Sequence, residues 1–141
     1  MGPLTLLKNI RRGRMQRLLC LATAASAPPL AFEVYLEHYK GSFGDKWMWT
    51  PIVLTPPLTA AAIAGFYSER AATRRLPFFG AVYAIDGLIG IATHVRGVRK
   101  RPGGFAEPTY NLVMGPPLLA PGSLAMVGTF GVVAALVRRE K

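Results

Sequence analysis

The sequence is poor in the residues that build disulfides and metal sites. It contains one cysteine, two histidines and seven acidic residues among 141. A single cysteine excludes an intrachain disulfide and a cysteine-based metal site, and no third soft ligand stands near the histidines to complete a zinc site. Walker, nucleophile-elbow, metalloprotease and dinucleotide-binding motifs are also absent. The chain is therefore not expected to be an enzyme on its own.

The sequence also lacks a long polar segment, because four apolar stretches fill most of it. They cover about 18–36, 50–67, 77–93 and 112–137. A bilayer core about 30 Å thick is crossed by about 20 predominantly apolar helical residues. The sequence therefore predicts an all-α, polytopic membrane protein, built as a four-transmembrane-helix bundle with proline-kinked helices. Small residues four apart, such as Gly80 and Ala84, are expected to let helix backbones approach closely.

Charge lies mainly between the apolar stretches, and it is strongly basic. Seventeen lysines and arginines give a net charge of +10. Anionic lipid headgroups attract basic residues that flank apolar spans, and no nucleic-acid recognition pattern accompanies them, so the predicted partner is the lipid bilayer and not nucleic acid. The predicted organisation is a basic segment at 1–17, a transmembrane domain at 18–137 and a basic tail at 138–141. A short basic connection at 68–76 is expected to join the second and third spans.

The distribution of basic residues predicts the orientation. If the N-terminus is inside, 11 of the 17 lie on the inner side and six on the outer side. The positive-inside rule therefore places both termini in the cytoplasm, with the chain in a bacterial inner membrane. The outer cluster from Arg96 to Arg101 is the contrary evidence. The residues 25–27 resemble a signal-peptidase site, but the apolar run continues to Leu36, so a retained first span is favoured over a cleaved signal.

The N-terminal segment has two interpretations. Apolar residues at Leu4 and Leu7, and others up to Met15, alternate with basic residues. This pattern is typical of an amphipathic helix that lies among the lipid headgroups. A frayed tail is the alternative.

Three similar strings of the form x-Pro-Pro-Leu occur in the first, second and fourth spans. A proline inside a helix removes a backbone hydrogen bond and clashes with the preceding turn, so each pair is expected to kink or break its helix. The pairs are interpreted either as packing kinks or as the walls of a cavity, because freed carbonyls should not face lipid. The predicted helix breaks are Pro28, Pro29, Pro56, Pro57, Pro116 and Pro117.

Four ionisable residues of the spans are candidate site residues: Glu33, His38, Asp86 and His94. Asp86 falls near the middle of the third span, where a carboxylate has to be paired, hydrated or protonated. His38 and His94 end the first and third spans at similar depth, so all four are expected to bound one cavity with the proline breaks. Such a cavity could hold haem b between the histidines, or a quinone, or a proton path. Interfacial histidines without a ligand are the alternative.

Three functional hypotheses follow. The leading one is an accessory or anchor subunit of a larger membrane complex, or a homo-oligomer, because a bundle of this size with no predicted extramembrane domain can house little chemistry alone. The second is an electron-transfer subunit that binds haem b or quinone near the outer face, with Lys40, Arg96 and Arg99 near the haem propionates. The third is a small transporter or proton-conducting protein that uses Asp86.

Overall fold

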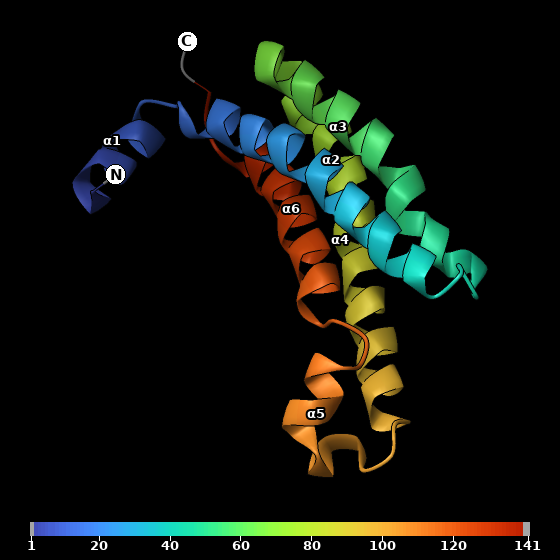
Figure 1. The fold of residues 1–141 in the computed structure, drawn as a ribbon. Helices are drawn as coiled ribbons and strands as arrows, with labels where there is room; N and C mark the ends of the chain where they lie inside the picture. Colours follow the sequence, from blue (N-terminus) through green and yellow to red (C-terminus); the bar gives the residue numbers. More distant parts are fainter. Residues whose placement is uncertain (1, 140–141) are drawn as a thin grey trace.

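The computed structural model describes residues 2–139, apart from the side chains of residues 6 and 9–11, and it is all-helical over that range. Four helical segments are long and apolar enough to cross a membrane. They are α2 (Met15–Lys40), α3 (Thr50–Tyr67) with the short η1 (Lys46–Trp49) before it, α4 (Glu69–Arg99) and α6 (Leu119–Leu136). The shorter elements are α1 (Pro3–Arg11), η2 (Gly104–Ala106) and α5 (Pro108–Val113). The predicted all-α architecture with four candidate membrane spans is confirmed (Figure 1).

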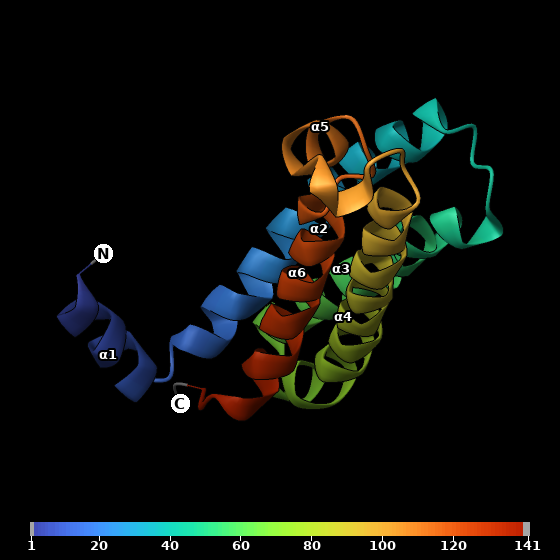
Figure 2. The ribbon, with the colours of Figure 1, turned by 90° about the horizontal axis from the view of Figure 1, so that it is seen from below.

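The four long helices form an antiparallel bundle in which each helix packs against two others. α2 packs on α3 and α6, while α4 packs on α3 and, most extensively, on α6. α2 and α4 therefore lie across the bundle from each other. The C-terminal ends of these two helices meet the N-terminal ends of α3 and α6 at one end of the bundle, which we call the histidine end because it holds His38 and His94. α1 projects away from the bundle (Figure 2).

The helices extend beyond the apolar segments that hydropathy detects. α3 coincides with the predicted span at 50–67, but α4 covers Glu69–Arg99 where 77–93 was predicted. The connection at 68–76 is much shorter than predicted, because only Ser68 is not helical. Its hydroxyl caps α4 by accepting from the Ala71 N–H at 3.4 Å, and Glu69 suits the positive end of the helix dipole. Hydropathy misses such charged turns because they continue the helix outside the apolar region.

Only one of the three double prolines interrupts a helix. α2 and α3 run through their proline pairs without interruption, whereas the third pair lies in the irregular segment 114–118 between α5 and α6. The predicted breaks at Pro28, Pro29, Pro56 and Pro57 are therefore wrong. The predicted fourth span at 112–137 is also wrong as one continuous helix, because α5 and α6 are separate. A proline pair removes only two N–H groups, while a full break in lipid would leave many more backbone groups without partners, so the remaining helix hydrogen bonds prevail.

α4 and α6 cross in direct backbone contact, at a surface that we call the glycine seam (Gly80, Gly87, Gly90, Gly128 and Gly131). A Cβ atom added at Gly80 would lie 2.7 Å from the carbonyl oxygen of Gly128, and one at Gly87 would overlap the backbone of Ala125. Neither position can accept a side chain without displacing the other helix. Small residues at these positions let the two helices pack by contact of their backbones, as the spacing of Gly80 and Ala84 predicts.

Polar side chains close the opposite end of the bundle. The Gln16 amide donates to the carbonyl of Ala134 near the end of α6, at 2.9 Å. The buried guanidinium of Arg139 donates to the carbonyls of Gly65 and Phe66 at the end of α3. These carbonyls have no partner in their own helix, and a cation there also interacts favourably with the helix dipole. Residues 140–141 of the predicted basic tail lie outside the described residues.

The glycine seam gives a paired prediction on α6. Gly128→Ala should destabilise the protein by roughly 1–3 kcal/mol, because the added methyl group overlaps the backbone of Gly80 and Ala84. Gly122→Ala is the control, since its Cβ position meets nothing within 4 Å beyond its own stretch of helix. That variant should be neutral or gain up to about 1 kcal/mol of helix propensity. Thermal unfolding in lipid nanodiscs measures both, and equal stabilities would contradict the seam.

Candidate functional site

A cavity of about 680 Å³ lies at the histidine end of the bundle. Its walls come from α2, α3, α4 and α6, together with η1 and the segment that precedes α6. The volume falls within the range of roughly 300–1,000 Å³ that is usual for small-molecule and cofactor sites. Most of its lining is apolar, and the polar side chains on it are Glu37, His38, Asp45, Thr50, Asp86, Thr93 and His94.

His38 and His94 come from helices on opposite sides of the bundle and meet in this cavity. Their ring centroids lie 6.5 Å apart, with an angle of 72° between the ring planes. The Nδ1 atom of His38 lies 2.8 Å from the carbonyl oxygen of Met48, and that of His94 lies 2.7 Å from the carbonyl oxygen of Pro117. A carbonyl only accepts, so each Nδ1 donates a hydrogen. In the neutral ring Nε2 then carries a free lone pair, the form of histidine that binds metals.

The sequence explains where both carbonyl partners come from. Met48 belongs to η1, whose first turn is capped by the Asp45 carboxylate. Pro117 lies in the irregular segment 114–118, which approaches α4 closely because Gly97 leaves space for the Pro116 ring. The third double proline thus interrupts the helix and presents a backbone carbonyl to the histidine of α4.

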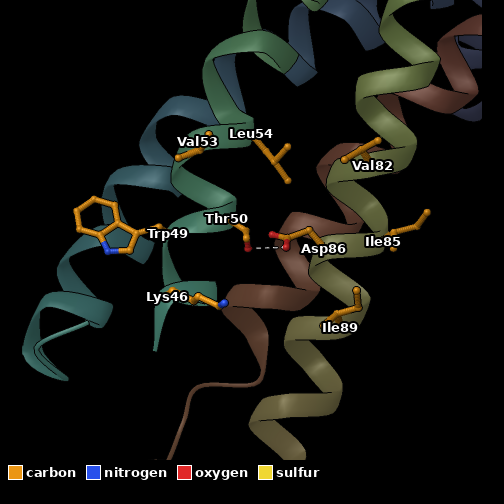
Figure 3. A pocket seen from close by; sticks show the side chains of 9 residues that line it. All are labelled: Lys46, Trp49, Thr50, Val53, Leu54, Val82, Ile85, Asp86 and Ile89. Atoms are coloured by element: carbon orange, nitrogen blue, oxygen red, sulfur yellow. Dashed lines mark hydrogen bonds between the residues drawn. The ribbon is translucent and has the colours of Figure 1, made fainter. Parts of the chain in front are cut away.

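Asp86 faces α3 from the middle of α4 and pairs with Thr50 (Figure 3). The Thr50 hydroxyl oxygen lies 2.6 Å from Asp86 Oδ1 and 2.8 Å from the carbonyl oxygen of Trp47. The hydroxyl has one hydrogen, so an ionised Asp86 competes with that carbonyl for it. A protonated Asp86 instead donates to the Thr50 oxygen and leaves the hydroxyl hydrogen for Trp47. The pair can therefore take up or release a proton by rearranging two hydrogen bonds.

Glu33 does not share this cavity. Its side chain is exposed, whereas Glu37, one turn further along α2, lines the cavity and forms an ion pair with Lys40. The buried face of α2 passes through Ala31 and Val34, and the helical period turns Glu33 away from it. The predicted position of Glu33 is therefore corrected. Among the six predicted prolines, Pro116 and Pro117 line the cavity, while Pro28, Pro29, Pro56 and Pro57 do not.

A smaller groove of about 360 Å³ adjoins the cavity between α3 and α4 (Figure 3). Thr50, Asp86 and Ile89 line both, so the Thr50–Asp86 pair forms a shared wall. Thr50 is a site residue that the sequence pattern does not predict. The available signal was weak: a hydroxyl residue at the start of an apolar span is as suited to capping a helix as to binding a ligand. The other residues of the groove are Lys46, Trp49, Val53, Leu54, Val82 and Ile85.

Comparison of the chain with protein-family models, curated protein sequences and solved structures gives no match. The chemistry of the site is therefore inferred from its own contacts. These contacts provide two imidazoles with free Nε2 lone pairs and one hydroxyl–carboxyl pair on a largely apolar cavity.

The contact between Thr50 and Asp86 can be tested by substitution. Thr50→Val should lower the free energy of unfolding by about 1–3 kcal/mol, because the half-buried Asp86 carboxyl loses its hydroxyl partner. Thr50→Ser keeps the hydroxyl and should restore most of the loss. Thr129→Val is the matched control, since the exposed Thr129 bonds only a carbonyl of its own helix. If thermal unfolding finds the two valine variants equally stable, the pair contributes nothing.

Proposed function

We propose that this protein is an electron-transfer subunit of a membrane complex, and that His38 and His94 would hold haem b in the cavity at the histidine end. One observation carries this proposal: two imidazoles from opposite helices face one cavity, and each has its Nδ1 hydrogen bonded to a backbone carbonyl. Metal-bound histidines have this second hydrogen bond almost without exception, because it orients the ring and leaves Nε2 for the metal.

The two rings lie close enough together for both to hold one iron. A metal–nitrogen bond is about 2 Å long and an imidazole centroid lies about 1 Å beyond the nitrogen, so two imidazoles on one metal would have centroids within about 6 Å of each other. The separation here is 6.5 Å. Among the described residues no group of three His, Cys, Asp or Glu side chains could hold a metal ion. A porphyrin removes that need, because it supplies four ligands itself.

The rest of the cavity suits a porphyrin with one charged edge. Val34, Ile89 and Leu124 supply apolar walls. The exposed cations Lys40, Arg96 and Arg99 belong to the same end of the bundle, where α2 and α4 terminate. Arg96 and Arg99 are suited to pair with propionates at the membrane surface, while Lys40 already forms an ion pair with Glu37.

We further propose that the chain lies in a bacterial inner membrane with both termini in the cytoplasm, which places the haem near the outer face. The excess of 11 basic residues over six supports this orientation. A single haem passes electrons only if a donor and an acceptor reach it, and partner subunits of a larger complex would provide at least one of them. The accessory role expected from the sequence and the electron-transfer role are thus two aspects of one proposal.

Haem binding has a direct spectroscopic test. Protein purified from haem-replete cells should show a Soret band and, after reduction with dithionite, the sharp α band of low-spin, six-coordinate haem b. His38→Ala and His94→Ala should each lose the low-spin spectrum. Glu33→Gln, which changes an exposed carboxylate of the same helix as His38, should keep it.

Added imidazole separates ligation from folding in this test. If the His94 ring is an axial ligand, free imidazole should restore the low-spin spectrum of His94→Ala, since it can occupy the vacated position on the iron. Folded wild-type protein that binds no haem when supplied with it would refute the proposal. A spectrum that is unchanged in both alanine variants would do the same.

The orientation predicts the behaviour of reporter fusions. A reporter active only in the periplasm should be inactive when joined to the C-terminus and active when inserted in the loop between α2 and η1, at residues 41–45. A reporter that fluoresces only in the cytoplasm should give the opposite result at both sites. Activity of the periplasmic reporter at the C-terminus would reverse the proposed orientation.

A further inference from the structure

The groove between α3 and α4 is accessible from the side of the bundle. Three of its residues, Val53, Ile85 and Ile89, have side chains that are 65%, 55% and 58% exposed. They belong to helices that are long and apolar enough to span a membrane, so this exposed surface faces lipid. A ligand of this groove would therefore enter from the bilayer and would need an apolar body.

The polar groups of the groove lie at its rim and at its base. The Lys46 side chain is exposed and points toward the gap between the helices, whereas the half-buried Thr50–Asp86 pair joins α3 to α4 (Figure 3). Together these groups include hydrogen-bond donors and an acceptor. An anionic lipid phosphate would meet the Asp86 carboxyl unfavourably. A neutral ring with oxygen atoms on opposite edges can instead use Lys46 at one edge and the Thr50–Asp86 pair at the other.

The Thr50–Asp86 pair also lines the cavity that holds the two histidines. A ring bound in the groove would therefore be separated from the cavity by a single layer of side chains. The volume of the groove, about 360 Å³, is near the lower end of the range for ligand sites. This size suits a ring headgroup whose tail remains in the lipid.

We propose that this groove binds the headgroup of a lipid-soluble quinone or quinol. In the quinone form one ring oxygen accepts from the Thr50 hydroxyl, and in the quinol form the ring hydroxyl donates to the Asp86 carboxylate. The Lys46 ammonium group donates to the oxygen on the other edge. The role of this site in electron transfer rests on the proposed haem, whereas the binding of the headgroup does not require it.

The test is photolabelling in nanodiscs with a decyl-tailed azidobenzoquinone, followed by peptide mapping. Label is expected on residues 49–54 and 82–89, and excess decylbenzoquinone should displace it. Val53 lines the groove but not the larger cavity, so Val53→Trp should fill the groove and reduce labelling by at least roughly tenfold. Ile63→Trp is the matched control, because this α3 residue is 51% exposed and lies outside the groove. It should leave labelling unchanged.

The outcomes separate this proposal from the one on which it builds. Labelling that is sensitive to Val53→Trp in a protein without a haem spectrum supports the quinone site and refutes the haem. A normal haem spectrum with labelling that is equal in the two tryptophan variants refutes the quinone site alone. Displacement of the label by added phosphatidylglycerol as effectively as by decylbenzoquinone also refutes it, because the groove is then a general lipid contact.

Discussion

The backbone contact between α4 and α6 sets the position of most other parts of this protein. Helices in lipid gain no hydrophobic free energy by associating, so their contact depends on close packing. Glycines on both helices make that packing closer than any side chain would permit. The same face of α4 continues through Gly90 and Gly97, which receive Pro121 and Pro116. Because of these contacts, the segment before α6 packs along α4, and the Pro117 carbonyl lies within hydrogen-bond distance of His94.

Backbone carbonyls at the two ends of the bundle accept hydrogen bonds from different kinds of side chain. At the end opposite the histidines, Gln16 and Arg139 donate to terminal carbonyls, and Gly65 packs against Cys20 and Ala72. That end is tightly packed and has its helix ends capped. At the histidine end, the carbonyls of Met48 in η1 and of Pro117 in the irregular segment 114–118 accept from imidazoles that also line a cavity. Polar contacts there satisfy the backbone and orient side chains with free lone pairs at the same time.

The helices could be predicted from the sequence to the extent that hydropathy and helix formation coincide. The helix α3 coincides with the apolar stretch 50–67, because it contains no charged residue and ends directly before Ser68. The limits of α4 differ from the predicted ones, because the turns that contain Arg70 and Arg96 are helical but charged. The proline pairs are identical in sequence pattern, yet only the third interrupts a helix. That difference depends on tertiary contacts, such as Gly97 against Pro116, that a local pattern does not contain.

The candidate site was partly predictable for a similar reason. Depth along a helix can be counted from the sequence, so the sequence predicts that His38 and His94 lie at a similar depth. It does not predict the distance between their rings, which is 6.5 Å. The direction of a side chain is harder, because it depends on which face of the helix is buried. Depth alone therefore groups Glu33 with the site, although the phase of α2 turns its side chain outward. Thr50 was missed because its partner, Asp86, lies 36 residues away and only the packing of α3 on α4 brings them together.

The shared wall between the two pockets has a thermodynamic consequence. Thr50 offers one hydrogen to two acceptors, so any bound molecule that engages Thr50 or Asp86 from the groove changes the hydrogen bonds available on the cavity side. Coupling of this kind is reciprocal: if occupancy of one pocket alters affinity at the other by some factor, the second alters the first by the same factor. If each pocket binds its proposed ligand, the two hydrogen bonds at this one threonine would couple them.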